Sequence, residues 1–293
     1  GRETFGAFLP PLVAACGLTA AINAGLLLAA DPRALADENH RLIPVVGMAR
    51  HKWPTTVSAT YAIMLVAAFA IAVAPAARRG VRVAAALAGV AIALALALTE
   101  TRSGYLAAVA GIVAVAAVLS RRVLLLTLAV IVVGVVALLL YPPALDAILA
   151  RGGSYRIAAW LRYLAFALEN PLVGTGLARR LWLTVEGGEG HHAHNMLISA
   201  LVRGGLIGFA GMALMLFGGL YYAWRRTTEK GSAAIFGMMV ALGVASVFDY
   251  DLILTPTDWM WLTFWMPIGL AAGAELAVRR GPSPAPATTT ART

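Results

Sequence analysis

Residues 81–99 read VRVAAALAGVAIALALALT. Apart from Arg82 near its start, this stretch carries no charged side chain. As a helix it would be about 28 Å long, at 1.5 Å per residue, which matches the roughly 30 Å hydrocarbon core of a bilayer. The stretch therefore predicts a transmembrane helix.

Seven further apolar runs of similar length predict that the chain crosses the membrane about eight times. Only 13% of the 293 residues are charged and 60% are hydrophobic, whereas soluble domains are about a quarter charged. Small residues, as at positions 84–86 and in the glycine-rich stretch 204–219, favour close packing of helices in lipid. We therefore expect an all-α polytopic membrane protein with spans at residues 5–30, 54–76, 81–99, 104–120, 122–141, 195–224, 232–250 and 257–278.

The positive charges in the short loops predict how the chain is oriented. Four clusters of Arg and Lys fall on one side of an eight-span arrangement, and such clusters mark the cytoplasmic side. The formal net charge of +9 then reflects topology and does not call for a nucleic-acid partner. The clusters are Arg78, Arg79 and Arg82; Arg121 and Arg122; Arg225, Arg226 and Lys230; and Arg279 with Arg280.

The non-cytoplasmic side carries more positive charge than the orientation rule favours. Its loop at 31–53, its short turn at 99–104 and its long loop at 142–194 hold ten Arg and Lys residues and all five histidines. This asymmetry predicts that the functional site lies on that side.

The same pattern divides the chain into four parts. Spans one to five lie within residues 1–141, the loop domain occupies 142–194, and spans six to eight lie within 195–278. The tail at 279–293 is rich in Pro, Ala and Thr, a composition typical of disorder.

The long loop is expected to contain a helix of its own. Ser154 can cap a helix over residues 155–169, and Asn170-Pro171 would end it. Residues 172–176, Leu-Val-Gly-Thr-Gly, indicate a turn. The helix is amphipathic enough to lie along the membrane surface, with its arginines directed into a cavity between the spans.

Three histidines lie within four positions, at His191, His192 and His194. Zinc binding, a solvated turn and a general base are all compatible with them. The spacing suits zinc poorly, and no cysteine or H-E-x-x-H motif accompanies it. A neutral imidazole accepts a proton near pH 7, so we favour His194 as the base, with His192 and the helix-capping Asn195 supporting it.

Arg102 lies in the turn at 99–104, between two apolar spans. Either it directs its charge to the membrane surface or pairs with Glu100, or it clamps phosphate. The clamp is chemically suitable because a guanidinium is always charged and presents a fork of donors to phosphate oxygens.

Arg50, Lys52 and Arg156 have two explanations of about equal weight. They bind lipid headgroups, or they bind a phosphate-bearing substrate. Among supporting residues, Arg203 lies one or two turns into the sixth span. Asp249 or Asp251, at the outer end of the seventh span, can orient a base or pair with an arginine.

Several arginines and a neutral histidine at the membrane surface suit one reaction class. The arginines bind and stabilise the pyrophosphate leaving group of a lipid-linked donor. The histidine removes a proton from an acceptor hydroxyl, and holding both substrates at the membrane makes the attack effectively intramolecular. Fixed guanidinium groups then replace a divalent metal, and we expect no metal or other cofactor.

Three motifs resemble those of the O-antigen ligase and polymerase superfamily of bacterial envelope glycosyltransferases. His194-Asn195, nine residues and then Gly205-Leu206-Ile207-Gly208 match the ligase pattern H-(N/S/Q)-x9-G-x-x-(G/T/Y). Residues 102–106 match the R-x3-L pattern, which has little specificity alone. Residues 170–176 resemble the stretch that precedes the histidine in this superfamily, and the similarity extends over about residues 50–260.

The resemblance implies an inverting, metal-independent transfer of polysaccharide from undecaprenyl pyrophosphate to a sugar hydroxyl of lipid A–core. It carries the essential histidine to His194, the essential arginines to Arg102 and Arg156, and an aspartate to Asp249 or Asp251. It also implies a GT-C-like fold of about twelve helices in the bacterial inner membrane, with a periplasmic site. The eight spans expected here would be its C-terminal part.

Other functions remain open at this point. An O-antigen or exopolysaccharide polymerase and a protein-glycosylating ligase are alternatives within the superfamily. Polymerases tend to have two large periplasmic loops, whereas only 142–194 is long here, which mildly favours the ligase. A transporter of lipid-linked sugars is the alternative from another class. Its polar groups should lie near mid-span and near broken helices, whereas the charged residues here cluster at one face, which argues against it.

Overall fold

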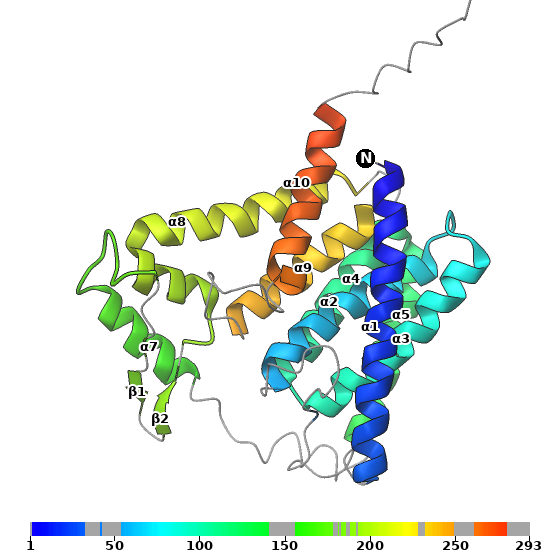
Figure 1. The fold of residues 1–293 in the computed structure, drawn as a ribbon, viewed down its shortest axis with the longest axis horizontal. Coiled ribbons are helices and arrows are strands. Elements are labelled where there is room, and N and C mark those ends of the chain that lie inside the picture. The colour runs from blue at the N-terminus through cyan, green and yellow to red at the C-terminus, as the bar shows by residue number, and fades with distance from the viewer. Residues whose placement is uncertain are drawn as a thin grey trace, which may run out of the picture.

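The computed structural model describes residues 2–32, 42, 54–140, 156–177, 181, 183–185, 188–191, 193–227, 232–248 and 261–279. Helices dominate this part of the chain (Figure 1). They are α1 (Arg2–Ala30), α2 (Pro54–Val73), α3 (Arg79–Thr99), α4 (Arg102–Leu119), α5 (Arg121–Leu139), α7 (Arg156–Ala167), α8 (Met196–Arg225), α9 (Ser232–Phe248) and α10 (Met266–Arg279), with the π-helical turn η1 (Trp261–Trp265) directly before α10.

A helix lies in each of the eight predicted apolar runs, and α7 lies within the predicted loop helix. Four described helices are long and apolar enough to cross a membrane: Phe8–Ala30, Arg79–Thr99, Arg102–Leu119 and Met196–Arg225. The chain is therefore a multi-pass membrane protein. The count of eight spans and the GT-C-like fold stay predictions.

Two features differ from the sequence-based expectation. The long loop contains an antiparallel hairpin of β1 (Leu183–Val185) and β2 (Gly188–His191), so the protein is not purely helical. The pairing sets His191 opposite Leu183 in the ladder, and strands this short carry little periodic pattern. The second difference is that α8 is broken at Gly205 instead of running straight.

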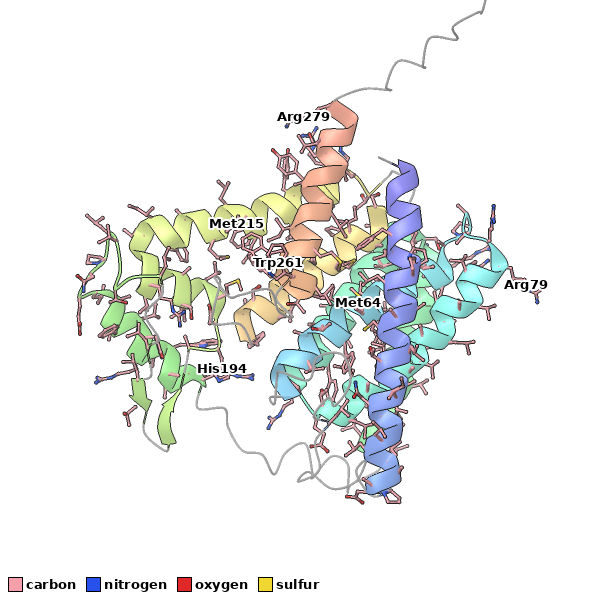
Figure 2. The ribbon with its side chains drawn as sticks, in the orientation of Figure 1. Met64, Arg79, His194, Met215, Trp261 and Arg279 are labelled. Carbon is pink, nitrogen blue, oxygen red and sulfur yellow. The ribbon has the colours of Figure 1, made fainter. Side chains whose placement is uncertain are left out.

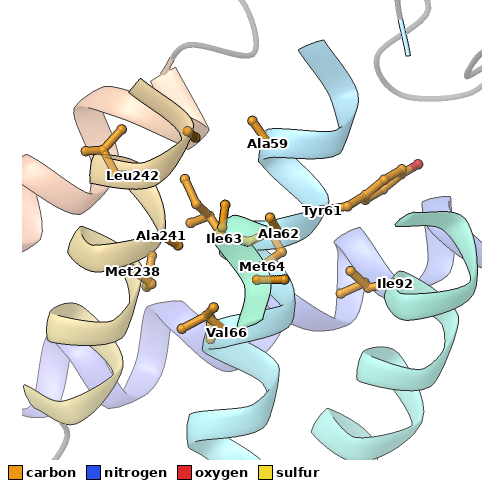
Figure 3. Packing of buried hydrophobic residues seen from close by; sticks show 14 of the residues in the cluster. Ala59, Tyr61, Ala62, Ile63, Met64, Val66, Ile92, Met238, Ala241 and Leu242 are labelled. Carbon is orange, nitrogen blue, oxygen red and sulfur yellow. The ribbon is translucent and has the colours of Figure 1, made fainter. Parts of the chain in front are cut away.

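The helices pack through small residues, as expected for helices in lipid. Where α4 crosses α9, a Cβ on Gly111 would lie 2.8 Å from the Gly237 carbonyl oxygen, and a Cβ on Gly237 would lie 2.8 Å from that of Gly111. The two backbones therefore touch directly. Beside this crossing, Met64 of α2 lies between Met238 of α9 and Ile92 of α3 (Figure 3).

Ion pairs join two of the predicted cytoplasmic clusters. Glu275 of α10 accepts hydrogen bonds from Arg226 Nε (2.9 Å) and from Arg279 Nε (2.9 Å). Arg226 follows the last residue of α8 and Arg279 ends α10, so these two helix ends lie side by side. Figure 2 shows His194 well away from both Arg279 and Arg79, as the predicted orientation requires.

The α4–α9 crossing should tolerate no added methyl group. Gly237→Ala should lower the thermal unfolding midpoint of the purified protein in detergent, because the Cβ would lie 2.3 Å from Val115 Cγ2 and overpacking costs about 1–3 kcal/mol. The control is Gly243→Ala in the same helix, where a Cβ meets nothing within 4 Å. Equal midpoints for the two variants would show that the crossing is not tight.

Candidate functional site

A sharp bend in α8 is the centre of the candidate site. Gly205 has a φ of 59° and a ψ of −158°, which no helix contains. A Cβ on Gly208 would lie 2.9 Å from the Ala200 carbonyl oxygen, whereas a straight helix separates residues eight apart by about 12 Å. The first limb, residues 196–204, therefore folds back against the second limb, residues 206–225 (Figure 1). We call this bend the α8 elbow.

Residues 170–176, which contain the turn predicted at 172–176 and are called the 170–176 turn below, supply the hydrogen bonds that the break removes. A break leaves carbonyl groups on one side and N–H groups on the other without helical partners, and in lipid each unsatisfied group costs several kcal/mol. Here the turn donates to the first limb and accepts from the second. The bonds run from Thr175 N to Val202 O (2.9 Å), Gly176 N to Arg203 O (2.9 Å), Leu206 N to Pro171 O (2.8 Å) and Ile207 N to Leu172 O (3.4 Å).

Two glycines allow this approach of backbone to backbone. Gly205 and Gly174 both have positive φ, at 59° and 65°. A Cβ on Gly205 would lie 2.2 Å from the Leu172 carbonyl carbon, and one on Gly174 would lie 2.5 Å from the Arg203 carbonyl carbon. Gly205 of the H-N-x9-G motif and Gly174, the first glycine of the 170–176 stretch, therefore both lie in the same backbone contact.

His194 occupies a strained position at the entrance to the first limb. It has a φ of 48°, a left-handed conformation that costs an ordinary residue about 1–2 kcal/mol. The next residue, Asn195, caps α8 by accepting a hydrogen bond from Ile198 N at 3.0 Å, as predicted. His194 is 8% exposed and its Nδ1 atom is buried. Backbone strain of this kind is concentrated at functional sites.

Helix α7 holds the residue that precedes His194. The Trp160 Nε1–H donates to the Ala193 carbonyl oxygen at 2.8 Å. One turn further on, the Tyr163 hydroxyl donates to the Leu181 carbonyl oxygen at 2.9 Å. Ala159, Tyr163 and Ala167 form the buried face of α7, so the helix, the end of the loop and the first limb form one packed unit.

The helical spacing of α7 distinguishes its two arginines. Arg156 is half-buried and lies one turn before Trp160, on the face that contacts the segment before His194. Arg162 is exposed and lies off that face. Of the two, Arg156 is therefore the one brought toward His194.

Arg102 is connected to this unit through α9. Gly111 faces Gly237 and Ala241, and Val115 faces Gly237, so α4 and α9 run antiparallel. Arg102 and Phe248 both lie roughly two and a half turns from that crossing, toward the same end of the pair. The centroids of the Phe248 and Trp160 rings are 6.1 Å apart. The start of α4 and the segment that contains His194 thus lie at the same end of the structure.

The turn that presents Arg102 is tightly built. Glu100 has a φ of 49° and closes α3 with a backbone hydrogen bond to Ala97. Of the non-glycine residues that the structure describes, Glu100 and His194 alone have positive φ. The buried Gly104 allows close contact with Ser58 of α2, since a Cβ there would lie 2.8 Å from Ser58 Cβ. Arg102 itself is exposed, which leaves its guanidinium accessible to a ligand.

The remaining predicted site residues divide into two groups. Arg203 is only 4% exposed and lies at the end of the first limb, directly before the elbow. The second group lies outside the described residues. It consists of Arg50, Lys52, His192, Asp249, Asp251 and Ser154, with most of the loop 31–53 and the tail after Arg279.

Sequence reasoning missed Trp160, which joins α7, Ala193 and Phe248. Its position on the predicted amphipathic helix was the available signal. A tryptophan that is half-buried needs a partner for its N–H group, but the sequence does not name the partner.

Comparisons with known proteins agree with the motifs. Residues 86–213 match the family model described as O-antigen ligase, and this segment includes Arg102, α7, the 170–176 turn, His194 and the α8 elbow. A stretch of 159 residues is 31% identical to the exopolysaccharide production protein ExoQ of Rhizobium meliloti (strain 1021). The stretch covers 47% of this chain and only 36% of that relative. The resemblance to the O-antigen ligase family is thereby confirmed.

The α8 elbow should depend on glycine at position 205. Gly205→Ala should lower the thermal unfolding midpoint of the purified protein, because its Cβ would meet backbone atoms that cannot rotate away and its φ disfavours any L side chain. We expect a loss of at least about 1–2 kcal/mol from the backbone conformation alone. Gly218→Ala, in the second limb with nothing within 4 Å, is the matched control. If both variants unfold at the parental temperature, the elbow geometry is wrong.

The Trp160 hydrogen bond should keep the segment before His194 closed. Trp160→Phe retains an aromatic ring but leaves the buried Ala193 carbonyl without that donor, at a cost of about 1–3 kcal/mol. Hydrogen exchange followed by mass spectrometry should then show faster exchange in peptides covering residues 193–200. The exposed Trp224 provides the control, Trp224→Phe, which should not alter this exchange. Unchanged rates in Trp160→Phe would contradict the tether.

Proposed function

We propose that this protein is a membrane glycosyltransferase of the polysaccharide ligase or polymerase type. In its most specific form, it is an O-antigen ligase that moves a polysaccharide from undecaprenyl pyrophosphate to a sugar hydroxyl of lipid A–core. The observation that carries the proposal is the strained, buried His194 at the start of the first limb of α8, within the segment that matches the O-antigen ligase family. The active site would face the periplasm, at the outer side of the bacterial inner membrane.

The proposed chemistry is a single displacement with inversion. The acceptor hydroxyl oxygen bonds to the anomeric carbon of the donor sugar, and the hydroxyl proton passes to His194. Because Nδ1 is buried, we assign proton acceptance to Nε2. The bond from the anomeric carbon to the diphosphate oxygen breaks, and undecaprenyl pyrophosphate leaves with the electron pair.

Arginine side chains would stabilise the departing charge. Arg102 and Arg156 lie at the same end of the structure as His194, and Arg50 and Lys52 are proposed to extend this positive surface. Guanidinium groups aimed at a developing charge lower the barrier because they need no reorganisation during the reaction. The transfer is therefore proposed to be metal-independent, with Asn195, His192, Arg203 and Asp249 in supporting roles.

A polymerase is the second candidate within this class. The name of the relative, an exopolysaccharide production protein, favours it, whereas the single long loop in this chain favours the ligase. A protein-glycosylating ligase differs from both only in its acceptor. A donor lipid supplied with lipid A–core, with a growing glycan chain or with a pilin, in separate reactions, would identify the acceptor by which product forms.

One observation in the structure favours a transporter of lipid-linked sugars. Such transporters bind substrate at broken helices, and α8 is broken. The backbone groups freed by the break are however satisfied by the 170–176 turn, and a candidate base, His194, directly precedes the limb that ends at the break. Product formation in detergent solution, where no compartments exist, would separate the two, because a transporter forms no new glycosidic bond.

Transfer by the purified full chain should depend on His194 and on the fork geometry of Arg102. We expect His194→Ala to slow transfer at least ~100-fold, as loss of a general base does. Arg102→Lys should slow it about tenfold or more, because an ammonium cannot reproduce bidentate phosphate contacts. The measurement is product formation from lipid-linked glycan and acceptor, with and without EDTA.

Arg162→Lys is the matched control, since Arg162 is exposed on α7 and lies off the face near His194; its rate should be parental. Near-parental transfer by His194→Ala would show that His194 is not the general base. Strong inhibition by EDTA would show that a metal takes part.

A further inference from the structure

A partly open cavity lies beside the α8 elbow. Its volume is about 200 Å³, far more than a single water needs. Both limbs of α8 contribute walls, the 170–176 turn adds its neighbour Leu177, and η1 closes one side with Trp265. The lining residues are Leu177, Ala200, Arg203, Gly208, Gly211, Met212, Met215 and Trp265.

Arg203 is the charged residue in this lining, and it is only 4% exposed. It lies nine residues after His194, roughly 13 Å further along the limb. A charge held inside a membrane protein is costly, and such residues are therefore associated with ion, proton or substrate sites. A guanidinium in this place provides a positive charge for an anion.

The rest of the lining favours hydrocarbon. Ala200, Gly208 and Gly211 are small and bring the ligand close to the backbone, while Met212 and Met215 are unbranched and adapt to irregular shapes. The wall formed by Trp265 belongs to a π-helical turn, a local irregularity that is frequent at functional sites. The ligand chemistry that fits is an anionic group with an apolar chain close to it.

We propose that the elbow cavity binds the phosphate-bearing head of a lipid, with Arg203 contacting the phosphate oxygens and the apolar walls contacting the first part of the chain. Two lipids of the membrane have this chemistry, the polyprenyl diphosphate of the donor and an ordinary anionic phospholipid. Assignment to the donor rests on the proposed function, whereas the lipid-phosphate site itself does not.

The test measures binding to the purified full chain in detergent, without any acceptor. The probes are undecaprenyl diphosphate, phosphatidylglycerol and undecaprenol, which lacks phosphate. We expect a phosphate lipid to bind at least about tenfold more tightly than undecaprenol, since hydrogen bonds to charged groups are the stronger kind. Tighter binding of undecaprenyl diphosphate than of phosphatidylglycerol would identify the donor as the occupant, and the reverse would identify the phospholipid.

Two variants locate the binding within the elbow. Arg203→Gln should weaken binding of the phosphate lipid about tenfold or more while leaving undecaprenol unaffected. Gly211→Leu should fill the cavity without displacing backbone, because a Cβ there meets nothing within 4 Å, and should weaken binding to a similar extent. Gly218→Leu is the matched control two turns along the same limb, also with open space around it, and should bind like the parent.

Parental affinity in Gly211→Leu, or equal affinity for undecaprenol and the phosphate lipids, would overturn the proposal. Its failure is distinguishable from failure of the proposed function, because transfer is not measured. A protein that transfers glycan but binds no phosphate lipid in the elbow retains its function and loses this site. A protein that binds the phosphate lipid but forms no product would support the lipid site and contradict the proposed function.

Discussion

The hydrogen bonds between the 170–176 turn and the break in α8 are the constraint on which the candidate site depends. A helix that is broken inside a membrane protein must satisfy its freed backbone groups within the protein, because lipid offers them no partners. The turn does so from both sides of Gly205. This requirement explains why a glycine pair at positions 174 and 205 and the sharp fold-back of α8 occur together.

The candidate functional groups lie around the start of the first limb and at the adjoining end of the α4–α9 pair. The first limb begins at the cap formed by Asn195, and His194, directly before the cap, has a left-handed conformation. Helix α7 holds the preceding residue through Trp160 and brings Arg156 toward it, and the antiparallel pair α4–α9 carries Arg102 to the same end. At the opposite end, Glu275 forms ion pairs with Arg226 and Arg279 and so joins the ends of α8 and α10. His194 and these basic side chains thus lie at one end of the structure, the end that the charge pattern predicts to carry the functional site.

Much of this arrangement is readable from the residues. Long apolar runs predict the helices, Asn195 predicts the cap, and residues 172–176 predict a turn. The sequence alone cannot show that this turn inserts into α8, because a glycine inside an apolar run is also common in straight transmembrane helices. The burial of Arg203 and the Trp160 tether depend on tertiary contacts between segments far apart in the chain. The β1–β2 hairpin was missed because strands of three and four residues show no usable periodicity.

The most direct test of the account is the sidedness of three positions in one membrane. Cys16 is the single cysteine of the chain and is replaced by Ala, so that Arg102→Cys, Arg162→Cys and Arg279→Cys each carry one reactive thiol. Spheroplasts are then treated with a membrane-impermeant maleimide. We predict labelling at 102 and 162 in intact spheroplasts, and at 279 only after the membrane is opened. Labelling of 102 and 162 from different sides would contradict a shared centre.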